Sequence, residues 1–349
     1  MTRENWLKVV ELRGCGEVPC HVVFAGAVWN EYRDRLQDVV LRYPGVFGEY
    51  RRREGSWDDF GPRERRGQRW TDRWGCVWDY AYDGIEGQVV GHPLTDWRAL
   101  NDLKAPDPAR ENDLDTVDWD SVRRQMEEAH QKDLPATGWI PHGFLFQRLY
   151  YLRGFENLML DFASGDGRLG ELIQIIVHYN LDLVRRWLAI GPDVIYFGDD
   201  LGMQDRLTVS PDMWRRHIKP AYARLFQECR QSGVHVYLHS DGYIADIFPD
   251  LIEIGVSIVN PQDLCNGLQR IRRELKGKVC IELDIDRQRI VPWGTPQEIE
   301  CHIRRCVEML GSPQGGLSLV CGIYPGTPLA NIEAVARAMD RYRTVFCRS

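Results

Sequence analysis

The feature that most constrains the fold is a repeated alternation of short apolar runs with longer amphipathic stretches. Each apolar run is bounded by turn residues, and amphipathic stretches such as 169–188, 211–231 and 295–310 lie between the runs. This order is typical of parallel βα units. The expected strands cover residues 21–25, 136–141, 193–198, 234–239, 257–260, 279–283 and 317–321.

Seven strands at this spacing predict an α/β fold, namely a single (β/α)8 TIM-type barrel over residues 1–349 in which one strand is not recognised. The alternative is an open doubly wound sheet, which would carry a glycine fingerprint after its first strand. The segment Phe24-Ala25-Gly26-Ala27-Val28 does not supply that fingerprint. The barrel is therefore the favoured fold.

One segment interrupts the alternation. Residues from about 70 to 93 contain two short apolar runs around the turn Asp83-Gly84, which predicts a β-hairpin inserted near the barrel mouth. Residues 101–120 are rich in Asp, Pro and Asn, and we interpret them as a linker into the next helix.

Charge and cysteine usage limit the partners. The formal net charge is -7, and the basic residues are spread along the chain, so no positive surface is expected to hold nucleic acid. The N-terminus does not resemble a signal peptide, and no apolar run is long enough to cross a membrane. The ten cysteines show no CxxC pair or short disulfide framework, which favours a reducing cytoplasm.

Polar side chains at strand ends are the candidates for chemistry, because barrel enzymes react at the C-terminal ends of their strands. The candidates include Asp199 and Asp200 after one strand, His239 and Asp241 after the next, then Gln262 and Glu282, with Cys321 on the last strand. Each also has a structural interpretation. Asp199 could cap a helix, His239 could be a core histidine, and Cys321 could be a small buried residue.

If the barrel brings His239, Asp241 and Cys321 together, they form a mixed imidazole, carboxylate and thiolate set with an open fourth position. That composition is typical of a catalytic zinc site. His239 and Asp241 are two residues apart on an extended segment, so their side chains are expected to face the same way. Cys321 must come from a strand far along the chain.

Several segments between 152 and 341 form a recognisable set, which includes Arg153-Gly154-Phe155-Glu156-Asn157, Phe197-Gly198-Asp199-Asp200-Leu201-Gly202, Val236-Tyr237-Leu238-His239-Ser240-Asp241-Gly242 and Cys321-Gly322. In these segments the chain resembles the uroporphyrinogen decarboxylase superfamily, and within it the cobalamin-dependent branch that is methylcobalamin:coenzyme M methyltransferase-like. The decarboxylases carry an arginine-rich motif after the first strand, and residues 24–29 lack it, so the resemblance implies a methyltransferase rather than a tetrapyrrole decarboxylase.

The resemblance also implies a zinc ion held by a His-x-Cys pair and a cysteine of the last strand, with an exchangeable Glu nearby. His239 and Cys321 match this pattern, Asp241 replaces the first Cys, and Gln262 stands at the position of the Glu. A carboxylate in place of a thiolate makes the ion a harder Lewis acid. We therefore expect zinc to polarise a methyl donor, with corrinoid on a partner protein as the methyl acceptor. Asp200 or Glu282 would supply a proton or a further ligand.

The expected substrates are small methylated compounds of the methoxyaryl, methylamine or betaine type, and relatives in this superfamily are often homodimers. Aromatic side chains at strand ends or in the hairpin could bind such a substrate or could be core and rim packing. His142 is a candidate ligand or a rim histidine. The expected substrate-binding residues are Trp29, Trp78, His142, Phe144, Tyr196, Asp199 and Gln262, with Trp139 beside them.

Two other functions remain open. A lyase or decarboxylase of a small carboxylic acid would use Asp199, Asp200 and Arg153 on the same scaffold. A non-catalytic small-molecule binding protein would use the pocket without chemistry.

Overall fold

The computed structural model describes residues 1–14 and 16–347. Its central feature is a parallel sheet of seven strands, whose order is β1-β10-β9-β8-β7-β6-β5. All seven predicted strands are confirmed within one or two residues at each end. They are β1 (Cys20–Phe24), β5 (Thr137–Trp139), β6 (Val194–Gly198), β7 (His235–Ser240), β8 (Ile258–Pro261), β9 (Cys280–Asp284) and β10 (Leu317–Ile323).

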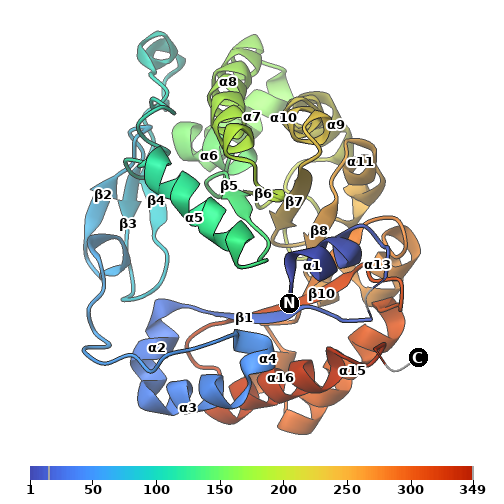
Figure 1. Cartoon of the computed structure of the whole chain (residues 1–349). Coiled ribbons are helices and arrows are strands. Elements are labelled where there is room, and N and C mark those ends of the chain that lie inside the picture. Colours follow the sequence, from blue (N-terminus) through green and yellow to red (C-terminus); the bar gives the residue numbers. More distant parts are fainter. Residues whose placement is uncertain (15, 348–349) are drawn as a thin grey trace.

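The sheet curves into a barrel-like α/β fold of the TIM type, and among the described residues it has seven parallel strands rather than eight. No described strand bridges β1 and β5, so the barrel is open between them. Figure 1 shows helix α5 (Trp119–Gln131) and a small second sheet on that side of the molecule. The expected eighth strand is therefore absent from the described chain.

The small sheet corresponds to the predicted insertion. It has three antiparallel strands, β2 (Arg69–Thr71), β3 (Val77–Asp79) and β4 (Gln88–Gly91), so the expected hairpin is present and gains a third strand. A buried ion-pair network fastens it to α6 (Phe146–Arg153). Arg148 of α6 lies 2.6 Å from Asp72 and 2.9 Å from Asp113.

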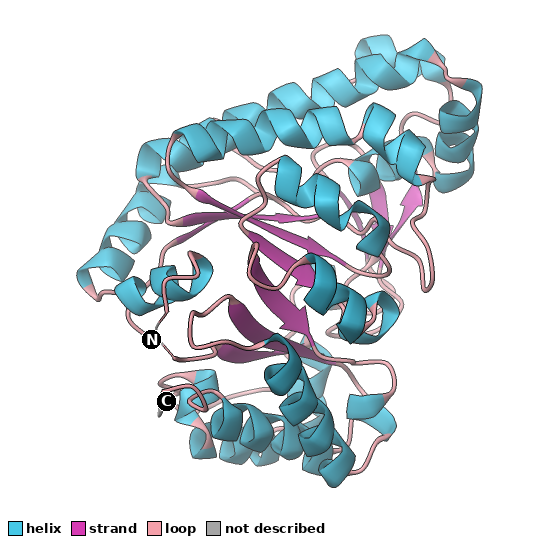
Figure 2. Cartoon of the chain, turned by 90° about the vertical axis from the view of Figure 1, so that its right-hand side faces the viewer, coloured by secondary structure: helices cyan, strands magenta, loops and turns pink. Residues whose placement is uncertain are grey.

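Helices cover the outer face of the parallel sheet, as Figure 2 shows.

The predicted helix over 211–231 is divided at Ile218, because Pro220, in the first turn of the second part, has no N–H to hydrogen-bond with the preceding turn. The remaining helices are α1 (Arg3–Val10), α2 (Gly26–Tyr32), α3 (Asp34–Arg42), α4 (Pro44–Phe47), α7 (Phe155–Ser164), α8 (Gly167–Ile190), α9 (Pro211–His217), α10 (Lys219–Gln231), α11 (Phe248–Glu253), α12 (Asp263–Asn266), α13 (Leu268–Glu274), α14 (Ile290–Trp293), α15 (Pro296–Leu310) and α16 (Leu329–Tyr342), with 3-10 turns η1 (Pro62–Glu64), η2 (Trp97–Asp102) and η3 (Ala245–Ile247).

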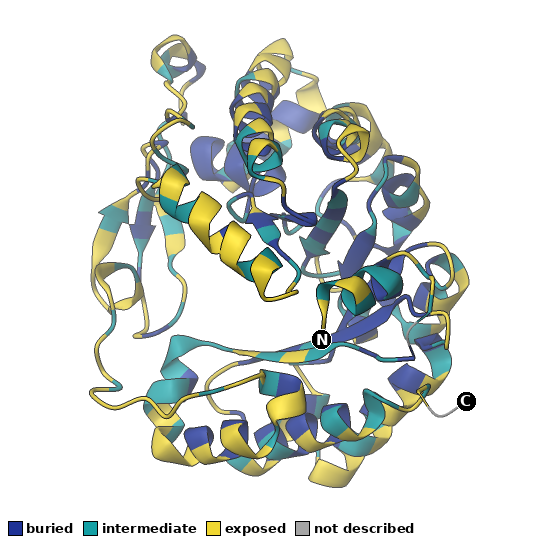
Figure 3. Cartoon of the chain, viewed as in Figure 1, coloured by how far each residue is buried: buried dark blue, intermediate teal, exposed yellow. Residues whose placement is uncertain are grey.

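The core lies in two places, on the outer face of the sheet beneath the helices and at the N-terminal end of the barrel, where α1 covers the strands. In Figure 3 strands β6, β8, β9 and β10 are mostly buried, β1 is intermediate to exposed, and the outer helix faces are exposed. Val9 and Val10 of α1 pack with Ile258 and Cys280 from the strands. Because one end is closed, the C-terminal ends of the strands form the accessible mouth. None of the described helices is long and apolar enough to span a lipid bilayer.

Candidate active site at the barrel mouth

Two carboxylates and one imidazole meet where β6 and β7 end. Asp200 follows β6, while His239 and Asp241 lie at the end of β7, which pairs with β6 through Gly198 and His239. His239 Nε2 lies 3.3 Å from Asp241 Oδ1 and 3.6 Å from Asp200 Oδ1. One ligand atom from each residue lies within 4.8 Å of the others. The structure thus brings together His239 and Asp241, as expected, and adds Asp200.

Asn260 of β8 orients His239. Its amide nitrogen donates to the backbone carbonyl of Glu282 at 2.6 Å, which turns the amide oxygen toward His239 Nδ1 at 2.5 Å. Because that oxygen can only accept, Nδ1 carries a proton and Nε2 faces the carboxylates. Burial acts to lower the pKa of His239, but the hydrogen bond to Asp241 and the charges of Asp241 and Asp200 raise it to about 9.

The Asp200 carboxylate is hydrogen-bonded to three groups. His142 Nε2 lies 3.2 Å from its Oδ2, Gln147 Nε2 donates to the same atom at 3.1 Å, and the backbone N–H of Asp241 donates to Oδ1 at 2.9 Å. Burial alone would raise the pKa of Asp200, but the hydrogen bond and charge of His142 and the charge of His239 hold it well below its usual range. Asp200 is therefore a carboxylate over the working pH range.

Arg287 and Gln262 hold Asp241 from the other side. The Arg287 guanidinium donates to Asp241 Oδ1, and Gln262 Nε2 donates to the same oxygen at 2.9 Å. Gln262 Oε1 in turn accepts from the backbone N–H of Gly242 at 2.9 Å. The structure therefore places Gln262, expected to contact substrate, as a group that positions Asp241.

Asp284 is a site residue that sequence reasoning missed. It lies at the end of β9, two residues after Glu282 and on the same face, and it is 4% exposed. Its Oδ2 is 3.6 Å from Arg287, and its Oδ1 has no hydrogen-bond partner. Burial raises the pKa of Asp284 to about 7, despite the nearby positive charges of Arg287 and His239. The sequence signal for Asp284 was its spacing of two residues from the candidate Glu282, which puts both side chains on the same face of the strand.

A cavity of about 500 Å³ opens beside this cluster, and its lining includes His239, Asp284 and Arg287. Aromatic rings form one wall. The Trp139 and Tyr196 centroids are 4.3 Å apart, and those of Tyr196 and Tyr237 are 4.7 Å apart. The cavity thus combines polar groups with aromatic faces, as small-molecule sites commonly do.

Glu282 also lines the cavity, as expected for a candidate catalytic residue. Its carboxylate accepts a hydrogen bond from the Tyr237 hydroxyl, and Ser318 Oγ donates to it at 3.3 Å. These two donors hold the carboxylate against the cavity wall. Tyr196 and His142 likewise lie at the site, the first in the cavity wall and the second against Asp200.

Three of the expected aromatic substrate-binding residues lie elsewhere. Trp29 stacks on Trp57 of the 48–61 loop, with ring centroids 5.7 Å apart. Trp78 is buried in the small sheet and donates to Asp72 at 3.1 Å, and Phe144 is buried against Tyr222. These three side chains perform structural packing and do not line the 500 Å³ cavity.

Asp199 lies on the outer face of the sheet, opposite to Gly198 at the mouth. It accepts hydrogen bonds from the backbone N–H groups of Phe146 and Gln147, at 2.5 and 2.8 Å, and from the Tyr222 hydroxyl at 2.8 Å. Burial raises the pKa of Asp199 to about 6. Asp199 is therefore not the N-cap of the helix that follows it, because Ser210 caps α9. Its carboxylate instead satisfies the first amides of α6, which precedes it in the chain.

The structure does not bring Cys321 to His239 and Asp241. The register pairs Ser318 with Glu282 and Val320 with Asp284, so even-numbered positions of β10 face the barrel interior. Cys321 therefore faces the helix layer, where it is fully buried in the main core. The mouth-facing position is Gly322, whose absent side chain leaves room for Arg287. The expected third ligand is thus on the wrong face of the strand.

The donor set at the mouth fits a divalent metal ion, although no thiolate belongs to it. His239 Nε2 and the carboxylates of Asp200 and Asp241 could hold the ion. A histidine that binds a metal through one ring nitrogen usually donates a hydrogen bond through the other, and His239 Nδ1 makes that bond with Asn260. A nitrogen and oxygen set favours a harder ion than a thiolate-rich site does.

Comparison with known proteins adds a family. A family model described as uroporphyrinogen decarboxylase (URO-D) matches residues 72–342. A solved structure of a methyltransferase from Methanosarcina mazei superposes with a TM-score of 0.67 at 15% sequence identity, covering 98% of this chain and 99% of that one. At this identity the structural match supports the fold.

Two curated relatives from Methanosarcina mazei are methyltransferases. The methylated-thiol--coenzyme M methyltransferase is 21% identical over 54% of this chain, and the chain spans about half of that relative's length, 48%. The methylcobamide:CoM methyltransferase MtbA is 19% identical over 74% of this chain and 74% of its own length.

Proposed function

The chain belongs to the uroporphyrinogen decarboxylase (URO-D) family, and we propose that it is a methyltransferase that moves a methyl group between a small methylated substrate and a corrinoid on a partner protein. The names of the two Methanosarcina relatives support this reaction class. The observation that carries the proposal is the cluster of His239, Asp200 and Asp241 beside an aromatic cavity.

The charge of the cavity disfavours a tetrapyrrole with many carboxylates. Its lining contains the carboxylates of Glu64, Glu86 and Glu282, and Arg287 is the one arginine among the described lining residues. Arg287 already faces Asp241 and Asp284. A polyanionic substrate would therefore meet repulsion, whereas a neutral methyl donor would not.

Among the expected substrate types, a methoxyaryl compound fits best. The ring faces of Trp139, Tyr196 and Tyr237 offer a stacking surface for an aryl group. When a methyl ether loses its methyl group, the leaving group is an oxyanion, which needs a Lewis acid or a proton donor. When a quaternary ammonium compound loses a methyl group, the leaving amine is neutral and needs neither. Asp284 and the metal-ligand set supply these two kinds of group on the same side of the cavity.

The roles of the chain's own residues follow from their contacts. His239, Asp200 and Asp241 would hold a divalent ion, zinc in our proposal, and such an ion supplies Lewis acidity at the heteroatom that carries the methyl group. Asp284 holds a proton at the cavity surface and donates it to the departing oxygen. Glu282, held by Tyr237 and Ser318, closes the wall beside it.

Two of the three residues expected for the small-acid lyase lie away from the mouth, and Asp200 is the one that is there. Arg153 is buried and pairs with Asp161 at 2.8 Å, and Asp199 caps α6 on the outer face of the sheet. Neither residue lines the 500 Å³ cavity. No observation therefore favours the lyase over methyl transfer.

The test is to mix the purified, metal-loaded protein with cob(I)alamin and to record the visible spectrum as methylcobalamin forms. A panel of methoxylated aromatics, methylamines and betaines would be compared. We expect turnover with methoxyaryl compounds and loss of turnover in His239→Ala. If no member of the panel reacts with free or protein-bound corrinoid, the methyl-transfer proposal is wrong, and retained substrate binding would then indicate a binding protein.

A further inference from the structure

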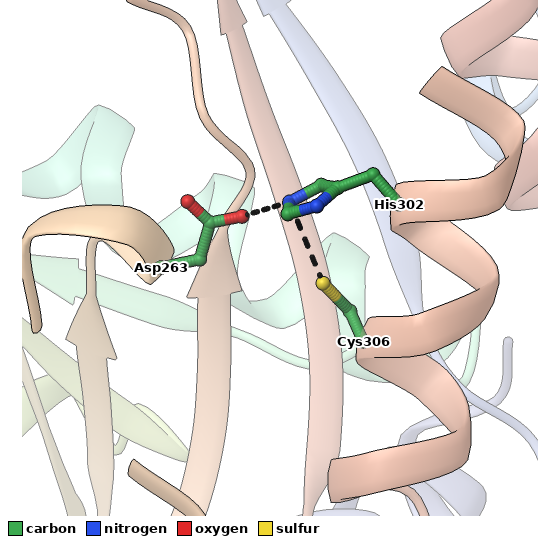
Figure 4. A group of neighbouring side chains, drawn as sticks. All are labelled: Asp263, His302 and Cys306. Atoms are coloured by element: carbon green, nitrogen blue, oxygen red, sulfur yellow. Dashed lines mark hydrogen bonds and ion pairs between the residues drawn. The ribbon is translucent and has the colours of Figure 1, made fainter. Parts of the chain in front are cut away.

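A second group of metal-ligating side chains lies outside the barrel mouth. Asp263, at the start of α12, and His302 and Cys306, both on α15, offer one ligand atom each within 4.8 Å of one another. Figure 4 shows the three side chains pointing toward one another between α15 and the segment after β8. His302 and Cys306 are four residues apart and thus share one helix face.

A plain hydrogen-bonded pair does not account for this arrangement. His302 Nε2 lies 2.6 Å from Asp263 Oδ2 and also 3.7 Å from Cys306 Sγ, so both groups converge on the same ring nitrogen. That nitrogen can hold one proton at most. Asp263 is 0% exposed, and its second oxygen, Oδ1, has no hydrogen-bond partner of normal geometry. The backbone N–H of Asp286 gives the carboxylate a polar contact that offsets only part of the cost of its burial. A poorly satisfied buried carboxylate oxygen is costly, and a cation would satisfy it.

The separations suit a bound ion. Ligating nitrogen and sulfur atoms in a tetrahedral zinc site lie about 3.5 Å apart, given bonds of about 2.0 and 2.3 Å, and the separation of His302 Nε2 from Cys306 Sγ is already 3.7 Å. The carboxylate must move away from the imidazole, and its free Oδ1 offers a second donor atom. Aspartate, a thiolate and a neutral imidazole together neutralise a divalent cation, which a buried site requires.

We propose that Asp263, His302 and Cys306 form a second zinc site, with three protein ligands and one open position, distinct from the metal-ligand set at the mouth. The two sites lie on opposite faces of the β8 segment, because Gln262 contacts Asp241 at the mouth while the next residue, Asp263, faces α15. The ion fastens α15 to the segment that carries Gln262.

Cobalt substitution distinguishes the two sites, because the mouth set contains no thiolate. The metal-free protein would be titrated with Co²⁺ while the absorption spectrum is recorded. A cobalt ion bound at Cys306 gives a thiolate-to-cobalt charge-transfer band in the near ultraviolet, whereas an ion bound only by His239, Asp200 and Asp241 gives none. We expect the band in the wild type and, with equal final intensity, in His239→Ala, where the mouth set is disrupted and the band should saturate at one equivalent.

Two cysteine variants locate the ligand. Cys306→Ser should abolish the band, while Cys229→Ser should retain it, since Cys229 is also a buried helix cysteine but donates to the Leu225 carbonyl in α10. Absence of the band in the wild type, or its persistence in Cys306→Ser, would show that the three residues form only a hydrogen-bonded cluster.

The site can also be tested in a protein that keeps Cys306, so that the result does not rely on Cys306→Ser to fold. X-ray absorption of zinc-loaded His239→Ala, in which the mouth set is disrupted, should give one sulfur ligand at about 2.3 Å. A zinc shell of nitrogen and oxygen alone, or no bound zinc, would overturn the proposal. Because the readouts are spectroscopic, failure of this site does not bear on methyl transfer, and failure of methyl transfer does not bear on this site.

Discussion

The amide oxygen of Asn260 lies 2.5 Å from Nδ1 of His239, and this contact leaves Nε2 as the ring atom that faces Asp200 and Asp241. The relationship joins two neighbouring strands, because His239 pairs with Asn260 in the β7–β8 register. The orientation of the candidate ligand is therefore built into the sheet and does not depend on a mobile loop.

Replacing Asn260 with Ala should weaken metal binding at the mouth. Loss of a hydrogen bond that orients a ligating histidine typically costs about 10- to 100-fold in affinity. The measurement is chelator competition with Zn²⁺ in the Cys306→Ser background, which removes the second proposed site. Asn157→Ala is the matched control, because Asn157 donates to a helix carbonyl away from the mouth. Equal affinities in both variants would contradict the role of Asn260.

The pH dependence of methyl transfer should report Asp284. A proton donor must be protonated, and burial raises the pKa of Asp284 to about 7. The rate with a methoxyaryl substrate should therefore be highest below pH 7 and fall as the pH rises through about 7. Asp284→Asn should remove this dependence and lower kcat by about 10²- to 10⁴-fold. Asp205→Asn, at an exposed rim position, should behave like the wild type.

Cys321→Ala should keep methyl-transfer activity, because the side chain faces the helix layer and not the mouth. The smaller side chain leaves a cavity in the core, so the free energy of unfolding should fall by about 1 kcal/mol. His239→Ala should abolish activity under the same conditions. Loss of activity in folded Cys321→Ala, assessed by circular dichroism, would restore the cysteine to the ligand set.

Trp139→Ala should raise KM for aromatic substrates. Trp139 is 54% exposed and stacks at the cavity wall, so its removal should cost binding energy and leave the fold intact. An aromatic contact contributes about 0.5–1.5 kcal/mol, which predicts a KM increase of about 2- to 12-fold. Trp29→Ala is the comparison, because Trp29 stacks on Trp57 and should leave KM unchanged. The reverse pattern would place the substrate in the other aromatic cluster.

Arg148→Met should destabilise the protein strongly. Arg148 is fully buried between Asp72 and Asp113, and its removal leaves two buried carboxylates without their cation. Breaking such a network costs about 3–5 kcal/mol of the free energy of unfolding, measurable by urea titration. Arg98→Met removes an exposed ion pair with Asp96 and should change stability little. A small effect of Arg148→Met would mean that the small sheet is held mainly by apolar packing.

The sequence alone determined the repeating architecture. Local apolar patterning marked all seven parallel strands, the turn at Asp83-Gly84 marked the inserted sheet, and the spacing of His239 and Asp241 placed them side by side. These features depend on neighbours along the chain, so periodicity and turn chemistry are enough to predict them.

Only the tertiary structure decided which distant residues share the mouth. A shift of one residue along a strand moves a side chain to the opposite face, so the register between β10 and β9 turned Cys321 outward and left Gly322 at the mouth. The same packing brought Arg287 and Asp284 inward and paired Asp263 with His302. No local pattern encodes strand register or helix placement, because both are set by how the complete sheet and its helices pack together.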